Sequence, residues 1–218
     1  MSQIKNRRAL INRKDLVIAL DHMVAEKSAS DWQQGLTAIL KDAHQHGWNE
    51  VKRRFTEEAE NGRMAATSLC YVMDQVLRTL YDFVTTHVYP LANPTSSEQL
   101  CLVATGGYGR GELAPFSDID LLFLIPYKST PWAENVVEYM LYVLWDLGLK
   151  VGHATRTPEE CTRLAKEDLT IRTLSVGRRS PVPGRRQTFH PPRGRPHRHR
   201  ICRPQAAGAR QPAQKNGR

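Results

Sequence analysis

Several features that would assign this chain to a class of protein are missing from its sequence. No apolar run of about 18 residues occurs, so the sequence predicts no membrane span. The basic start at residues 1–8 has no apolar stretch behind it, which argues against a secretory signal. The four cysteines form no C-x-x-C pair, which favours thiols in a reducing compartment. We therefore expect a cytoplasmic protein.

Acidic residues are missing from the end of the chain. After Asp168 there is no Asp or Glu, whereas residues 177–218 contain eleven Arg and one Lys. The chain has 31 basic residues, and the other 19 lie in residues 1–176, together with all 22 acidic residues. Residues 1–176 therefore carry a net charge of −3, although the whole chain carries +9. The positive charge therefore belongs to the tail, and the rest has no global field that attracts nucleic acid.

Composition divides the chain into three regions. Residues 1–96 are expected to be helical, with one helix starting near Ser30 or Asp31 and a long apolar helix after Gly62 that packs on the next region. Residues 97–173 are expected to form an α+β core with a short mixed sheet. Its expected elements are strands at 100–104, 118–125 and 149–155 and helices at 132–147 and 158–166. Residues 174–218 have seven Pro and few large aliphatic residues, so we expect disorder there.

Two aspartates open the second expected strand. Asp118 and Asp120 are two positions apart, so both carboxylates should point to one face while Ile119 points into the core. Acidic groups at the start of a buried strand are costly unless they are paired or bind a cation. Mg²⁺ fits this pattern, because it takes carboxylate oxygens together with substrate phosphate oxygens.

A glycine pair ends the first expected strand, shortly before the aspartates. Gly106 and Gly107 lack Cβ atoms, so the chain can turn tightly and bring backbone N–H groups against phosphate oxygens. Arg110 either pairs with a triphosphate or is a solvated surface residue, and Ser117 either donates to a nucleotide or serves the turn. The segment contains neither a P-loop nor a complete dinucleotide-binding fingerprint followed by a helix. A disordered RNA-binding segment is also disfavoured, because apolar strands flank it.

The segment 106–122 reads G-G-Y-G-R-G-E-L-A-P-F-S-D-I-D-L-L, and residues 149–157 read L-K-V-G-H-A-T-R-T. Both resemble the N-terminal catalytic module of bacterial PII uridylyltransferase/uridylyl-removing enzymes, which belong to the polymerase-β-like nucleotidyltransferase superfamily. The resemblance implies transfer of UMP from UTP to a tyrosine of the nitrogen-regulatory PII protein. It also implies that Asp118 and Asp120 hold Mg²⁺, while Gly106 and Gly107 hold the triphosphate. The choice of UTP over ATP as the nucleotide rests on the resemblance alone. Transfer of AMP to another protein of nitrogen metabolism is therefore the nearest enzymatic alternative.

The sequence departs from the resembled family in two respects. The superfamily usually adds a third carboxylate from a later strand, but Leu149 to Thr155 contains no acid, and Gly152 and His153 occupy the place. His153 is either a substitute base or a structural residue. We also expect this chain to lack the family's phosphohydrolase and glutamine-sensing modules, because the sequence contains no H-D pair.

The resemblance stops after Thr173, and the residues that follow have the composition expected of G+C-rich DNA read out of frame. We therefore expect residues 174–218 to be non-native, which would leave an impaired or inactive fragment. A family-like continuation in another reading frame of the coding DNA would support this. A genuine basic arm that binds nucleic acid is the alternative, and such binding should weaken steeply with salt.

Overall fold

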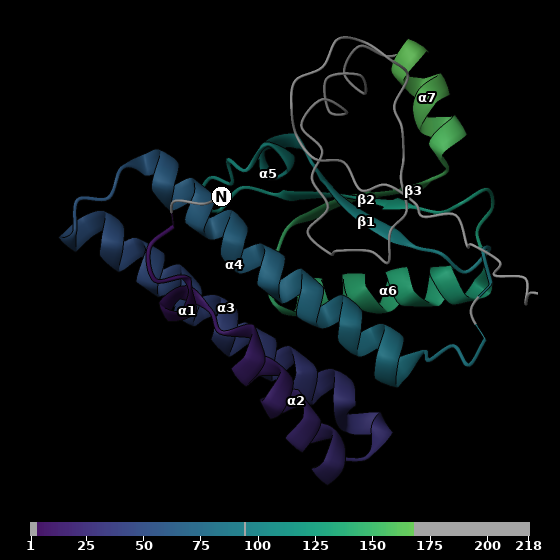
Figure 1. Ribbon diagram of the computed structural model, residues 1–218, viewed down its shortest axis with the longest axis horizontal. Helices are drawn as coiled ribbons and strands as arrows, with labels where there is room; N and C mark the ends of the chain where they lie inside the picture. Colours follow the sequence, from purple (N-terminus) through teal and green to yellow (C-terminus); the bar gives the residue numbers. More distant parts are fainter. Residues whose placement is uncertain (1–3, 94, 168–218) are drawn as a thin grey trace, which may run out of the picture.

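The computed structural model describes residues 4–93 and 95–167, so the predicted tail at 174–218 lies outside the described residues. Its N-terminal half is helical, as predicted. The helices there are α1 (Arg7–Leu10), α2 (Arg13–Glu26), η1 (Ala29–Asp31), α3 (Trp32–Glu57), α4 (Gly62–Phe83) and η2 (Val84–Val88). The two longest, α3 and α4, lie side by side (Figure 1). Each helix within residues 4–93 and 95–167 is too short or too polar to cross a membrane.

A three-stranded mixed sheet follows, which confirms the predicted α+β core. Its elements are β1 (Cys101–Thr105), α5 (Gly106–Arg110), β2 (Ile119–Leu124), α6 (Pro131–Asp146), β3 (Val151–Arg156) and α7 (Pro158–Glu167). The central strand β2 runs antiparallel to β1 and parallel to β3. The parallel pair requires a crossover, which α6 supplies. Gly148 follows this helix with φ +80°, as expected for its cap.

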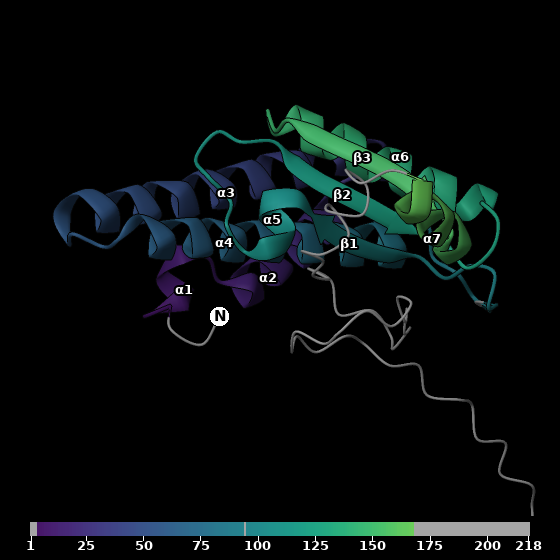
Figure 2. The ribbon, with the colours of Figure 1, turned by 90° about the horizontal axis from the view of Figure 1, so that it is seen from above.

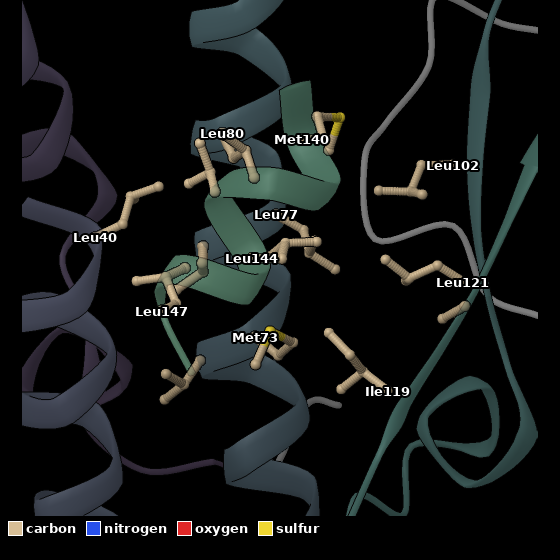
Figure 3. Packing of buried hydrophobic residues seen from close by; sticks show 14 of the residues in the cluster. Leu40, Met73, Leu77, Leu80, Leu102, Ile119, Leu121, Met140, Leu144 and Leu147 are labelled. Carbon is tan, nitrogen blue, oxygen red and sulfur yellow. The ribbon is translucent and has the colours of Figure 1, made fainter. Parts of the chain in front are cut away.

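Helices cover both faces of the sheet, with α6 on one side and α7 on the other (Figure 2). On the α6 side, side chains from α4, α6 and the sheet meet in one hydrophobic cluster (Figure 3). The labelled residues there include Met73 and Leu77 of α4, Met140 and Leu144 of α6, and Leu102, Ile119 and Leu121 of the sheet. The long apolar helix thus packs on the strands, as its sequence predicted.

Two local features differ from the sequence prediction. The turn after β1 contains a short helix, α5, where a loop was expected. Asp31 is the N-cap of α3, as proposed, but its side chain makes no capping hydrogen bond. Its carboxylate instead accepts a hydrogen bond from Ser28 Oγ at 2.8 Å, because Ala29–Asp31 forms a separate 3₁₀ turn.

A partly buried ion-pair network fixes the N-terminal segment to α3. Glu50 accepts hydrogen bonds from Arg53 and Arg54, and Arg54 also donates to the backbone oxygens of Lys5 and Asn6. Hydrogen bonds from Arg53 and then Arg54 lower the pKa of Glu50 from 4.5 to about 2. The Glu50 side chain is 17% exposed, so solvent screens these bonds only in part.

Replacing Glu50 by Gln should lower the free energy of unfolding by about 1–2 kcal/mol at neutral pH. This is near the lower end of the values for hydrogen bonds to a charged group, because Glu50 and Arg53 are partly exposed to solvent. A lowered pKa stabilises the fold above the ordinary value of 4.5, and the benefit is lost as the pH falls through about 2. The difference between variant and wild type should therefore shrink over this range in urea titrations. Glu57→Gln, at an exposed partner of Arg53, is the control and should cost less than about 0.5 kcal/mol. Equal losses in both variants would contradict a special role for Glu50.

Candidate active site

The register of the sheet places Asp120 between the two outer strands. Asp120 pairs with Thr105, the last residue of β1, and with Gly152, the second residue of β3. Ile119 is 2% exposed and lies in the core, so the next side chain along β2 points to the opposite face. The carboxylate of Asp120 therefore lies where β1 ends and α5 begins.

Two glycines leave the space that the Asp120 carboxylate occupies. A Cβ atom added to Gly152 would lie 2.6 Å from Oδ1, and one added to Gly106 would collide with Oδ2. Gly106 also has φ +59°, a conformation that side chains disfavour. The glycine at the start of the turn and the aspartate of β2 are thus brought together, as the sequence predicted.

Asp118 lies just before β2 and is exposed, whereas Asp120 is half-buried. The pKa of Asp120 is raised, mainly because burial disfavours its charged form and also because Asp118 carries a like charge nearby. A cation bound at this position would relieve both effects. The two carboxylates are therefore close enough to interact electrostatically.

Of the remaining predicted site residues, Arg110 ends α5 and Ser117 lies between α5 and β2. Arg110 is exposed, and its Nε lies 3.4 Å from Glu112 Oε2, a loose ion pair that leaves the guanidinium available to a ligand. One of its terminal nitrogens lies 3.7 Å from a Cβ added to Gly107, so it reaches the glycine turn. Ser117 Oγ donates to Ala114 O at 3.0 Å, which is the turn role considered for it, and its contact with a nucleotide stays a prediction.

His153 does not lie beside the aspartates. It pairs with Leu121 of β2, so its side chain shares the face of Leu121 and not that of Asp120. Its ring lies 6.2 Å from that of Trp145 on α6, so it is on the face of the sheet that α6 covers. A general base at His153 is therefore inconsistent with this arrangement. Within residues 4–93 and 95–167, no group of three or more His, Cys, Asp or Glu residues could hold a metal ion.

Comparison with known proteins agrees with this geometry. Residues 96–175 match the family described as Nucleotidyltransferase domain. The bifunctional uridylyltransferase/uridylyl-removing enzyme of Rhodospirillum rubrum is 53% identical over 175 residues, which covers 80% of this chain and 19% of that enzyme. The enzyme of the same name from Azospirillum brasilense is 51% identical over 190 residues, covering 87% and 20%. The one from Caulobacter vibrioides is 62% identical over 135 residues, covering 62% and 14%.

The chain is homologous to one part of these enzymes. It spans about a fifth of the length of the R. rubrum and A. brasilense relatives. The resemblance predicted from the glycine pair and the D-x-D motif is thereby confirmed, and so is the nucleotidyltransferase class of the core.

The residues present fit a divalent metal ion, on which a nucleotidyltransferase domain of this kind typically depends. Two carboxylates are within the number that Mg²⁺ takes from a protein when substrate phosphates complete its shell. Because Gly106 and Gly152 lack side chains, the Asp120 carboxylate fits between them, which fixes the position of one of the two metal-binding groups. The donor set is thus suited to a metal–nucleotide complex rather than to a metal bound by the protein alone.

The site predicted from the sequence did not include Gly152. A glycine inside a short strand often marks a close approach of another group, so V-G-H at 151–153 carried a usable signal. Which group approaches could not be read from it, because the pairing of β2 with β3 is not a local property.

Proposed function

We propose that residues 97–173 are the catalytic core that transfers UMP from UTP to a tyrosine of the PII signalling protein, supported by the helical region at 1–96. The observation that carries this proposal is the Asp120 carboxylate, packed against Gly106 and Gly152 and electrostatically coupled to Asp118. The uridylyltransferase named among the homologues supports the choice of nucleotide. The PII protein as acceptor follows from the family resemblance.

In this reaction the tyrosine hydroxyl gives up its proton to solvent and its oxygen forms a bond to the α-phosphorus of UTP. The bond from that phosphorus to the oxygen bridging to the β-phosphorus breaks, and pyrophosphate leaves. Asp118 and Asp120 would hold Mg²⁺, which stabilises negative charge on the attacked phosphate and the leaving group when it is bound. Backbone N–H groups at Gly106 and Gly107 would orient the triphosphate. Arg110 would exchange its loose contact with Glu112 for a phosphate oxygen.

The proposal is tested by incubating the chain with purified PII protein, Mg²⁺ and UTP labelled at the α-phosphate. We expect label on PII, none on a PII variant whose acceptor tyrosine is replaced by phenylalanine, and little from α-labelled ATP. Equal labelling from ATP would instead favour an adenylyltransferase. No labelling would mean that this chain is an inactive fragment. Salt-sensitive binding to nucleic acid without labelling would favour the arginine-rich tail as the functional part.

A further inference from the structure

A buried carboxyl group on α4 contacts the glycine-rich turn directly. Asp74 is 2% exposed, and its Oδ1 accepts a 2.7 Å hydrogen bond from the hydroxyl of Tyr108, which is itself 1% exposed. Tyr108 stands between Gly107 and Gly109 in α5. A carboxyl group taken out of water is costly unless it is hydrogen-bonded, so this pair is a specific contact rather than an incidental one.

The same face of α4 makes a second contact with this segment. Cys70 precedes Asp74 by four residues, so the two side chains lie on one side of the helix. The backbone N–H of Leu113 donates to Cys70 Sγ at 3.2 Å. Residues 108–113 are thus held against α4 at two points, one helical turn apart.

These contacts matter because α5 has little stability of its own. It is five residues long, and three of them are glycines, the residue type that, after proline, most disfavours a helix. An isolated helix of this length does not form in water. Its position, and with it the position of the Gly106 and Gly107 N–H groups, must come from tertiary contacts.

We propose that Asp74 is a positioning residue for nucleotide binding, acting through Tyr108 to hold the phosphate-binding turn at a fixed place beside Asp118 and Asp120. This inference rests on the proposed function and adds a part of the helical region to its site. The hydroxyl of Tyr108 thus fixes the turn that would hold the triphosphate part of the nucleotide.

The test measures binding of Mg²⁺·UTP and of Mg²⁺ with inorganic triphosphate to the full chain by calorimetry. Tyr108→Phe removes only the hydroxyl and should raise both dissociation constants about tenfold, an effect of the size expected for one hydrogen bond to a charged group. Asp74→Leu should do the same. Asp74→Asn keeps an acceptor oxygen and should stay within about threefold of wild type.

Tyr81→Phe is the matched control. Tyr81 lies on α4, as Asp74 does. Its hydroxyl donates a 3.1 Å hydrogen bond to the backbone oxygen of Leu100, away from α5. It should lose stability in urea as Tyr108→Phe does, yet bind both ligands like wild type. Unchanged binding by Tyr108→Phe, an equal loss in Tyr81→Phe, or a loss for UTP but not for triphosphate would overturn the inference alone. A wild-type chain that binds neither ligand would overturn the proposed function as well.

Discussion

Asp120→Asn should lower the rate of UTP-dependent labelling of PII by about a thousandfold or more. The substitution keeps the size of the side chain but removes the charge that a metal requires, and a bound metal stabilises the transition state by several kcal/mol. Asp118→Asn should have an effect of similar size, because a shared ion needs both carboxylates. The measurement is the initial rate of label transfer at saturating UTP and Mg²⁺.

A binding assay separates loss of the metal site from loss of the fold. Mg²⁺ with UTP at about ten times the dissociation constant should raise the melting temperature of the wild type by about 3–6 °C. Neither aspartate variant should show this rise. Without ligand, Asp120→Asn should melt above the wild type at neutral pH, because it removes a carboxylate whose raised pKa reflects burial and the nearby charge of Asp118. Asp21→Asn, at an exposed acid on α2, should behave as wild type in both assays. Transfer that survives both site substitutions would end the metal role.

Gly152→Ala should reduce transfer by about a hundredfold or more while changing stability little. The added methyl group would lie 2.6 Å from Asp120 Oδ1, so the carboxylate must move out of its position. The residue is exposed on an outer strand, where alanine costs the backbone nothing and has less conformational entropy to lose than glycine. Activity should therefore fall without a matching fall in the free energy of unfolding.

The readouts are the labelling rate, the melting rise with Mg²⁺ and UTP, and urea unfolding. Gly62→Ala, where an added Cβ meets no atom within 4 Å, is the control and should leave the first two unchanged. Gly106→Ala should be at least as inactive as Gly152→Ala, but also less stable, since φ +59° strains a side chain. Full activity in Gly152→Ala would show that transfer tolerates a displaced Asp120 carboxylate. The absence of a side chain at Gly152 would then not be required for activity.

The elements that the sequence predicted correctly are those with local signals. The apolar run after Asp118 indicated β2, and the helical spacing that ends at Gly148 indicated α6. The short helix α5 was not predicted, because Gly106, Gly107 and Gly109 disfavour a helix and the Tyr108 contact that supports it comes from α4. Local patterns cannot report such tertiary support.

The candidate site divides in the same way. Gly106 and Asp120 were predicted as neighbours because one strand ends and the next begins within a single short segment. The close approach of Gly152, and the placement of His153 on the other face, depend on how β2 and β3 align. That alignment is set by packing across the sheet, and a shift of one residue would exchange the two.

The hydrophobic cluster that joins α4 and α6 to the strands makes it difficult for the nucleotidyltransferase core to be transferred to another protein without the helical region. A gene rearrangement that carried only residues 97–167 into another protein would leave Leu102, Ile119 and Leu121 without the partners that α4 provides. It would also separate the glycine turn from Asp74. The helical region and the sheet are therefore expected to pass between proteins together, as one evolutionary module with its support included.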